Sequence, residues 1–315
     1  MTAIRTAVIG VGVQGERHAQ KLATCEASTL VSVVDAEADR AASVAAQFGV
    51  QALTDYRDLI GQVDAVAVAT PTTTHFEITK ALLENGIHVL LEKPISVVVD
   101  EGKELARLAE KNSVVLQIGH LERYNPVVAA IAESVQAPVF IESTRIAPYR
   151  PRSLDVSVIL DLMIHDIDLI LSFIGAPIEH VDAIGRSVFS NSIDIANARI
   201  RFSDGCVATV TSSRISMKTE RMLRVFEADS YLSADLQHKT LARFTRKSRG
   251  PVAGPEDVAI ENQAFGDSDA MLAQTEAFLV SVSGGAQPLV SGRSATEALE
   301  TAIAIVDTVN RQDAG

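Results

Sequence analysis

The sequence predicts an α/β protein of two domains: a doubly wound parallel-sheet domain in residues 1–120 and an α+β domain with an open, mainly antiparallel sheet in residues 121–315. Three observations lead to this prediction. Up to about residue 118, short apolar runs alternate with helical patterns. Beyond that point, several β-type runs follow one another without helices between them. The length of 315 residues also suits two cores of ordinary size.

In the N-terminal half, each short apolar run is followed by a segment with the spacing of an amphipathic helix. Strands that are apolar throughout and alternate with helices are typical of a parallel sheet covered on both faces. The predicted strands are Thr6–Ile9, Leu30–Val34, Ala65–Ala69, His88–Leu91 and Val114–Ile118. The predicted helices are Gln14–Ala23, Ala36–Phe48, His75–Asn85 and Val97–Lys111.

The C-terminal half has one early helix pattern, Ser157–Phe173, and two late ones, Ala270–Val282 and Ser294–Asn310. Between them lie β-type runs, and Ser203–Gly205 separates two of these as a hairpin turn would. This order indicates a mostly antiparallel sheet. The predicted strands are His180–Phe189, Ala196–Phe202, Val207–Ser213, Arg221–Glu227 and Tyr231–Asp235.

Composition restricts the function classes. The chain has 28 basic and 40 acidic residues, a balance that argues against binding of nucleic acid or an anionic membrane. No apolar stretch approaches the roughly 20 residues that a membrane span requires, and the N-terminus lacks the order of a secretory signal. The two cysteines, Cys25 and Cys206, make no disulfide framework. We therefore expect a cytoplasmic protein with a small-molecule partner.

A glycine pattern, G-x-G-x-x-G, stands between the first predicted strand and the first predicted helix. Gly10 permits a tight turn, Gly12 lets the backbone approach a pyrophosphate, and Gly15 lets helix and strand pack closely. The helix N-terminus offers free N–H groups and a positive dipole end to that pyrophosphate. An ordinary glycine-rich turn is the alternative. The loop residues expected to contact a dinucleotide are Gly10, Gly12, Val13, Gln14 and Gly15.

Asp35 favours the dinucleotide interpretation. It follows the second predicted strand, about 20 residues beyond Gly15, where a carboxylate can accept hydrogen bonds from the adenosine ribose hydroxyls. Its alternative role is to cap a helix starting near Ala36. A 2′-phosphate would lie against this carboxylate, so NAD is the expected cofactor in preference to NADP, although Arg40 can soften that preference.

Two further motifs follow later strands, at the edge where open α/β sheets bind their ligands. In Ala69–His75 (ATPTTTH), Thr70 and Pro71 end a strand and the threonines start a helix, which suits a lid over the nicotinamide or simple helix capping. In Glu92–Pro94 (EKP), a lysine can contact the nicotinamide ribose and a substrate hydroxyl together, and the proline is a candidate cis residue. The expected cofactor contacts here are Thr70, Pro71, His75, Glu92, Lys93 and Pro94.

These motifs resemble those of the glucose–fructose oxidoreductase / inositol dehydrogenase (Gfo/Idh/MocA) family of NAD(P)-dependent enzymes. Its five motifs occur here in order and span almost the whole chain, as Gly10–Gly15, Ala69–His75, Glu92–Pro94, Arg123–Pro126 and Asp161–His165. The resemblance implies a Rossmann domain followed by an open, mainly antiparallel sheet. It also implies an NAD-dependent dehydrogenase that acts on a CH–OH group.

Asp161 and His165 are four residues apart, which places them on one face of a helix. An imidazole suits proton exchange with an alcohol, and a nearby carboxylate can orient it. A helix pair without a catalytic role is the alternative. With the resemblance, the catalytic residues are expected to be Lys93, His165 and Asp161, and the residues leave open whether Lys93 or His165 is the base. No metal is expected, because no further ligand stands at a recognisable spacing.

Two segments, Gly119–Pro126 and Glu142–Asp168, look like the subgroup that oxidises the 3-hydroxyl of UDP-N-acetylglucosamine to a 3-keto sugar. A partner aminotransferase then uses that sugar in lipid A synthesis. Arginines just ahead of the catalytic helix can meet a diphosphate, or they can be exposed or ion-paired. The candidate substrate-binding residues are Arg123, Tyr124, Asn125, Arg150 and Arg152, with Arg145 as a further candidate.

Two alternatives stay open. One is a dehydrogenase of a free sugar or cyclitol, and the other is a non-catalytic NAD-binding regulator. The joint presence of Lys93, Asp161 and His165 disfavours the regulator, which needs none of them. The resemblance also implies a homodimer or homotetramer that pairs through the open face of the C-terminal sheet.

Overall fold

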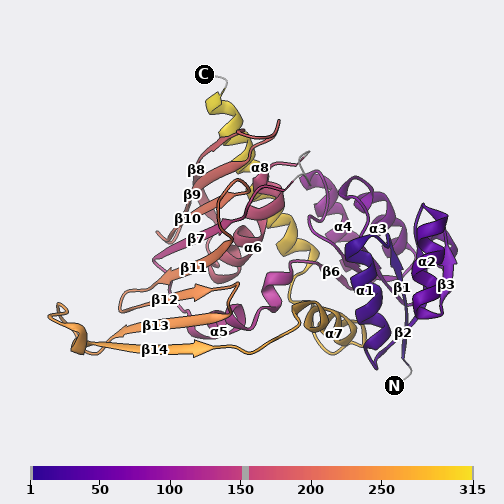
Figure 1. Ribbon diagram of the computed structural model, residues 1–315, viewed down its shortest axis with the longest axis horizontal. Helices are drawn as coiled ribbons and strands as arrows, with labels where there is room; N and C mark the ends of the chain where they lie inside the picture. Colours follow the sequence, from indigo (N-terminus) through magenta and orange to yellow (C-terminus); the bar gives the residue numbers. More distant parts are fainter. Residues whose placement is uncertain (1–2, 151–155, 314–315) are drawn as a thin grey trace. The chain divides into compact units, whose positions relative to one another are not determined.

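The computed structural model describes residues 3–150 and 156–313, and it divides into two compact units (Figure 1). The first unit contains the residues up to Tyr124 together with Asp269–Glu297. The second contains Asn125–Ser268 and the residues from Ala298 onward. The predicted division into 1–120 and 121–315 therefore needs correction, because a distant C-terminal segment belongs to the first unit.

The first unit contains a six-stranded parallel sheet of order β3-β2-β1-β4-β5-β6. The predicted doubly wound sheet is thus confirmed. Strand order reverses between β1 and β4, the point at which such sheets bind ligands beyond the carboxyl ends of their strands. The strands are β1 (Ile4–Ile9), β2 (Ser28–Val34), β3 (Gln51–Leu53), β4 (Ala65–Val68), β5 (His88–Leu91) and β6 (Leu116–Ile118).

Helices α1 (Val13–Thr24), α2 (Ala38–Phe48), α3 (His75–Glu84) and α4 (Val99–Asn112) connect these strands, with short 3₁₀ turns at Tyr56–Leu59, Thr72–Thr74 and Leu121–Tyr124. Helix α7 (Ala270–Val282) also belongs to this unit and packs against α1. Phe278 and Leu279 of α7 lie in one hydrophobic cluster with Ala19 and Leu22 of α1. This apolar contact explains the corrected boundary, since sequence order gives no sign of it.

The second unit contains an eight-stranded sheet of order β14-β13-β12-β11-β7-β10-β9-β8. Its neighbours run antiparallel except β7 and β10, which are parallel, so the predicted mainly antiparallel sheet is confirmed. The strands are β7 (Phe140–Ile146), β8 (Ile178–Arg186), β9 (Ile195–Phe202), β10 (Val207–Ser213), β11 (Glu220–Phe226), β12 (Ser230–Asp235), β13 (Thr240–Arg246) and β14 (Val258–Ala264). Of these, β7, β13 and β14 were not predicted.

The second unit also has the helices α5 (Pro126–Ser134) and α6 (Ile164–Phe173), and most of α8 (Gly292–Asp313). Helix α5 was not predicted, although its start is marked by Asn125 as N-cap and Pro126 in the first turn. The sequence predicts one helix over Ser157–Phe173. In the structure, Ile159–Met163 forms a π-helical turn and the α-helix α6 begins only at Ile164. Such π turns occur frequently at functional sites.

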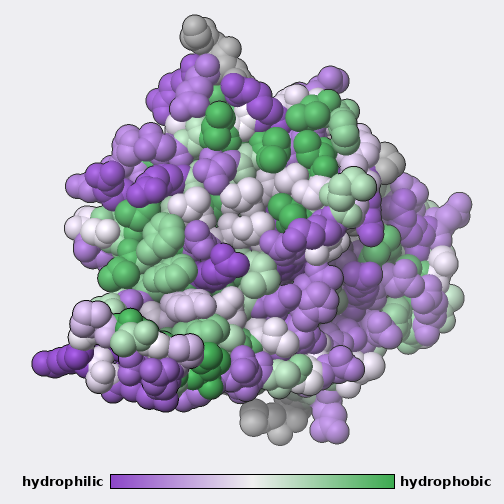
Figure 2. Space-filling view, turned by 60° about the vertical axis from the view of Figure 1, so that its left-hand side comes forward, coloured by the Kyte–Doolittle hydropathy of each residue, from purple (hydrophilic) through white to green (hydrophobic). Residues whose placement is uncertain are grey.

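The two faces of the second sheet differ. On β7, Ile141, Ser143 and Arg145 are buried on the face against α6, and alternate residues point to the other, open face. Residues on six neighbouring strands form one row in register across that open face, which we call the open-face row. It consists of Val207, Phe140, Phe226, Tyr231, Phe244 and Ile260. Figure 2 turns these strands toward the viewer and shows hydrophobic patches separated by hydrophilic side chains.

Among the described residues, no helix is long and apolar enough to cross a membrane.

Candidate cofactor site and catalytic helix

The glycine loop lies between β1 and α1, as the sequence predicts. Gly10 has a φ of +80°, and a side chain on Gly15 would lie 1.8 Å from the Gly10 carbonyl oxygen, so both positions require glycine. A side chain on Gly12 would meet nothing within 4 Å, so its backbone faces open space. Helix α1 begins here without a side-chain cap, which leaves N–H groups for an anion. The loop therefore has the features that a dinucleotide pyrophosphate requires.

Val13 and Gln14 form the first turn of α1. Val13 is 74% exposed, and the Gln14 side chain accepts a hydrogen bond from Arg17 at 3.0 Å. Their backbone groups, rather than their side chains, are thus the groups available to a phosphate at this helix end.

Asp35 follows β2 and lies directly beneath the glycine loop. Its Oδ2 accepts a hydrogen bond from the Val11 backbone N–H at 2.9 Å, and its Oδ1 accepts one from the Glu37 N–H at 3.0 Å. Arg40 contacts both carboxylate oxygens, at 3.2 and 3.3 Å, and pairs with Glu37 as well. Helix α2 begins only at Ala38, so Asp35 is not its N-cap. Asp35 thus links the end of β2 to the loop that would carry the pyrophosphate.

The segment after β4 folds against the glycine loop. A side chain on Gly10 would lie 2.8 Å from both the Ala69 carbonyl oxygen and Thr70 Cγ2. Thr74 Oγ1 donates a hydrogen bond to the Pro71 carbonyl at 2.8 Å and lies 2.9 Å from Thr70 Oγ1. Thr72–Thr74 form a short 3₁₀ turn ahead of α3, and neither this turn nor α3 has a side-chain cap, so the expected capping role is wrong.

His75, the first residue of α3, is buried. Its Nδ1 lies 2.8 Å from the Pro94 carbonyl oxygen and its Nε2 lies 3.0 Å from the Thr70 carbonyl oxygen. Burial lowers the pKa of His75 below its ordinary value, although both carbonyls oppose this shift. With 1% of its surface exposed, His75 supports the two loops from within, and it cannot make the cofactor contact that was expected of it.

The segment Glu92–Pro94 follows β5, and the Lys93–Pro94 peptide bond is cis, as the sequence suggested. Glu92 Oε1 accepts a hydrogen bond from His18 Nε2 of α1 at 2.8 Å. Burial raises the pKa of Glu92, but the hydrogen bond and charge of His18, together with Lys93, outweigh it and lower that pKa overall. The Glu92 side chain is therefore engaged by α1. Of the three residues expected to contact the cofactor, Lys93 and Pro94 stay candidates, and both are half-buried.

In the second unit, Asp161 lies in the π turn and His165 in the first turn of α6, and both side chains are half-buried. The next residue along, Asp166, points into the protein. It accepts hydrogen bonds from Arg145 Nε at 2.6 Å and Ser143 Oγ at 2.8 Å. These contacts tie α6 to β7. They also correct the suggestion that Arg145 meets a diphosphate, because Arg145 is 4% exposed and ion-paired.

The candidate substrate residues fall in different places. Arg123 donates to the Leu289 carbonyl at 3.3 Å, and Tyr124 beside it is half-buried. Asn125 is buried, accepts from Val127 N–H and donates to the Leu236 carbonyl, so its side chain caps α5 instead of facing a ligand. Arg150 is exposed, and Arg152 lies outside the described residues.

Two site residues were missed by sequence reasoning. His18 lies one turn beyond Gly15, and only the fold reveals that it faces Glu92. Gly119 is the second, and the structure shows why this position suits glycine. A side chain there would lie 3.1 Å from Glu92 Oε2 and 3.3 Å from Glu92 Cα.

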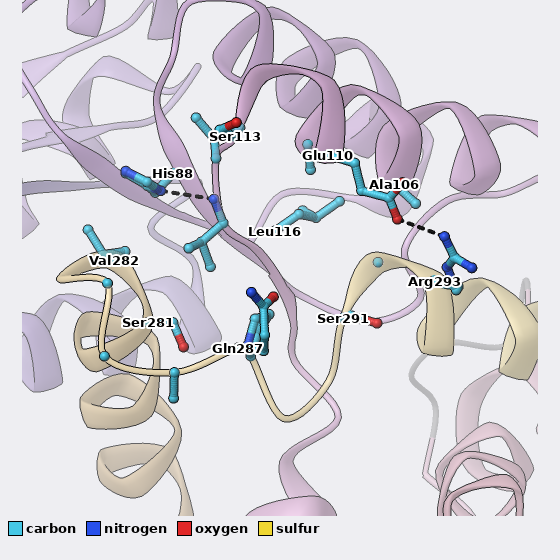
Figure 3. A pocket seen from close by; sticks show the side chains of 18 residues that line it. His88, Ala106, Glu110, Ser113, Leu116, Ser281, Val282, Gln287, Ser291 and Arg293 are labelled. Carbon is cyan, nitrogen blue, oxygen red and sulfur yellow. Dashed lines mark hydrogen bonds and ion pairs between the residues drawn. The ribbon is translucent and has the colours of Figure 1, made fainter. Parts of the chain in front are cut away.

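No group of His, Cys, Asp and Glu within residues 3–150 and 156–313 is arranged to hold a metal ion. A cavity of about 1040 Å³ lies elsewhere in the first unit (Figure 3). It borders the amino ends of β5 and β6, between the end of α4 and the segment 281–293, opposite the glycine loop. His88 accepts a hydrogen bond from Val115 there, and Glu110 pairs with Arg293 at its rim.

Comparison with known proteins agrees with this architecture. Residues 4–120 match the oxidoreductase family with an NAD-binding Rossmann fold, and residues 140–229 match the GFO/IDH/MocA C-terminal domain.

Individual relatives add detail. A UDP-N-acetylglucosamine 3-dehydrogenase from Acidithiobacillus ferrooxidans is 37% identical over 97% of both chains. The solved structure of the dehydrogenase of that name from the same organism covers 98% of both chains with a TM-score of 0.91 and 35% identity. The scyllo-inositol 2-dehydrogenase (NAD(+)) of Bacillus subtilis is 27% identical, over 97% of this chain and 94% of its own. A levoglucosan dehydrogenase in complex with NADH, 17% identical, shares the fold with a TM-score of 0.88 over 98% of both chains.

Proposed function

Because this chain belongs to the Gfo/Idh/MocA oxidoreductase family, whose N-terminal domain is an NAD-binding Rossmann fold, we propose that it oxidises the 3-hydroxyl of UDP-N-acetylglucosamine to the 3-keto sugar with NAD. The observation that carries the proposal is the 37% identity to a UDP-N-acetylglucosamine 3-dehydrogenase, which extends over 97% of both chains. Inositol dehydrogenases match at lower identity.

The choice of NAD rests on Asp35. Asp35 follows β2, and its carboxylate lies beside the glycine loop. There it can accept hydrogen bonds from the ribose hydroxyls of adenosine and would repel a 2′-phosphate. Arg40 is occupied by Asp35 and Glu37, so it offers little to such a phosphate while Asp35 is present. When bound, NAD accepts the hydride that leaves the substrate carbon.

The protein supplies the proton chemistry. Lys93 in the first unit and His165 in the second are the two candidates for the group that takes the hydroxyl proton. Whichever nitrogen remains charged stabilises the developing alkoxide electrostatically. Asp161 is the candidate that orients the acid–base group and stabilises its charged form. Arg150 is the described arginine available for a diphosphate, since Arg145 is buried in an ion pair.

The direct test is NADH formation, followed by absorbance, with UDP-N-acetylglucosamine, myo-inositol and glucose offered separately. A glutamate-dependent aminotransferase or a carbonyl trap should be present to remove the ketone. Among the three sugars, the proposal expects a signal only with UDP-N-acetylglucosamine. Mass spectrometry of a reaction run without trap or aminotransferase should show loss of two hydrogens from the sugar. Lys93→Met is the matched control and should lower the rate of NADH formation by about 10²- to 10⁴-fold.

A signal only with a free polyol would reject the nucleotide sugar while keeping the family assignment. In that case Arg150→Ala would leave turnover unchanged. Absence of turnover with every sugar, combined with tight NAD binding, would favour a regulator.

From the similarity to the UDP-N-acetylglucosamine 3-dehydrogenase, we also propose that an aminotransferase uses the product, as in the synthesis of lipid A precursors. We propose that this reaction takes place in the cytoplasm. This placement rests on the proposed 3-keto product, since a transaminase can act only on such a carbonyl. The test is conversion of the 3-keto sugar to a 3-amino sugar when the aminotransferase and glutamate are added in place of the carbonyl trap.

We propose a homodimer or homotetramer that buries the open-face row. Aromatic rings continue across four strands of this row, with centroid distances of 5.7, 5.2 and 4.4 Å, and Ile260 at its end is 55% exposed. A contiguous apolar surface of this kind typically marks an interaction site. Tyr231→Glu should dissociate the oligomer in light scattering, whereas Met217→Glu, at a fully exposed residue, should not. Dissociation by neither variant would reject this interface.

A further inference from the structure

Two buried histidines flank the turn that carries Lys93. His18 of α1 donates through Nε2 to Glu92, the residue before the lysine, at 2.8 Å. His75 of α3 places Nδ1 2.8 Å from the carbonyl oxygen of Pro94, the residue after it. The side chain of His18 and the whole of His75 are only 2% and 1% exposed. The lysine is thus bracketed by residues that are tied to two different helices.

The Glu92 carboxylate is confined from a second side as well. Its Oε2 lies against Gly119, where a side chain would come within 3.1 Å of it. The Gly119 N–H donates to the Leu91 carbonyl at 2.8 Å, which keeps that backbone in place. Glu92 therefore has little room to move while His18 holds its other oxygen.

The two contacts of His75 are not equivalent. A carbonyl oxygen can only accept, so each contact is a hydrogen bond only when the ring nitrogen carries a proton. Burial lowers the pKa of His75, which favours the neutral ring with one proton. The contact with Pro94 is the shorter, at 2.8 Å against 3.0 Å with Thr70, so we place that proton on Nδ1.

We propose that His18 and His75 are positioning residues that hold Lys93 in the orientation required for proton exchange with the substrate hydroxyl, acting through Glu92 and Pro94. The inference rests on the proposed function, in which Lys93 takes part in the chemistry. It adds that the helix receiving the dinucleotide also holds the lysine turn, since His18 lies on α1 just after the glycine loop.

The His75 contact can be tested with two amide variants that each keep one nitrogen. In His75→Asn the amide nitrogen replaces Nδ1 and can still donate to Pro94, whereas in His75→Gln it replaces Nε2 and reaches Thr70 instead. We expect His75→Asn to keep kcat near wild type. We expect His75→Gln to lower kcat by about 100-fold, the usual loss for a reacting group misplaced by an ångström. The Kd for NAD, measured by titration calorimetry, should be unchanged in both.

His18 allows a similar pair. His18→Gln preserves a donor at the Nε2 position and should retain most of kcat, whereas His18→Leu should lose it. His88→Asn is the control, because His88 accepts from Val115 at the opposite end of β5 and should leave kcat unaffected.

A second measurement does not depend on turnover. Hydrogen–deuterium exchange of the peptide covering residues 91–98 should rise about fivefold in His75→Gln and His18→Leu, the change expected when one net hydrogen bond is lost. The rest of the first unit should stay protected. If no sugar is oxidised by the wild type, the proposed function fails and exchange alone decides this inference. It is overturned if His75→Gln and His18→Leu match wild type in exchange, or if exchange rises while kcat stays unchanged.

Discussion

The turn that carries Lys93 and the helix that carries His165 are held by different chemistry. Beside Lys93, the holding groups are the imidazole rings of His18 and His75, which contact Glu92 and the Pro94 carbonyl. Beside His165, Asp166 is paired with Arg145, whose guanidinium cannot be neutralised, and both side chains are 5% exposed or less. The difference suggests that the first arrangement mainly positions a reacting group, whereas the second is also essential for the stability of its unit.

The largest expected effects come from the reacting groups themselves. Lys93→Met and His165→Asn should each lower kcat by about 10²- to 10⁴-fold, the range for loss of a general acid or base. Steady-state kinetics over a pH series will identify the base, because a base must be unprotonated to act and its loss removes the fall in kcat/KM at low pH. Near-normal turnover in both variants would show that neither residue does this chemistry.

The next largest difference is expected in the free energy of unfolding, when one carboxylate of each region is replaced by its amide. Asp166→Asn leaves Arg145 charged in the interior and should cost about 3–5 kcal/mol of unfolding free energy. Glu92→Gln keeps an oxygen that can accept from His18 Nε2 and should cost only about 1–3 kcal/mol. Urea unfolding followed by fluorescence or circular dichroism gives both values. Equal losses would remove the distinction drawn between the two regions.

Cofactor choice depends on one carboxylate in the first unit. Asp35→Ser removes charge-assisted hydrogen bonds worth about 1.5–3 kcal/mol, so kcat/KM with NAD should fall by about 10- to 100-fold. The same change releases Arg40 from Asp35, and NADP use should rise. The double variant Asp35→Ser with Arg40→Ala is the control and should lose the gain with NADP. An unchanged ratio of NAD to NADP activity would contradict the role given to Asp35.

The smallest effect concerns acid stability of the second unit. Asp194 is buried, and although burial raises its pKa, hydrogen bonds from Ser190, Val188, Phe189 and Arg214 hold that pKa well below its ordinary value. A lowered pKa gives stability that is present above the ordinary aspartate range and lost as pH falls toward the folded-state value. The stability gap between wild type and Asp194→Asn should therefore narrow from about pH 5 to about pH 3. A constant gap would reject this account.

Local patterns were enough for much of the fold and part of the site. The apolar runs before Gly10, Asp35, Thr70 and Glu92 predicted parallel strands, and the carboxyl ends of such strands meet at one edge. The glycine loop and the cis Lys93–Pro94 bond are accordingly where the sequence predicts them. These features depend on neighbours in the chain, which a sequence displays directly.

Tertiary structure decided what the polar side chains do. Glu92 and His75 were expected to contact a cofactor. In the folded protein, Glu92 instead bonds to His18, and the buried ring of His75 contacts the backbone carbonyls of Pro94 and Thr70. The sequence alone made Arg145 a candidate for binding a diphosphate. The packing of β7 against α6 shows instead that it pairs with Asp166. The partners in these contacts lie between 5 and 74 residues apart, so the helix and strand periodicities of the sequence do not predict them. The sequence by itself thus determined the sheet, the loops and the chemical class, and long-range packing decided which polar groups face a ligand and which hold the others in place.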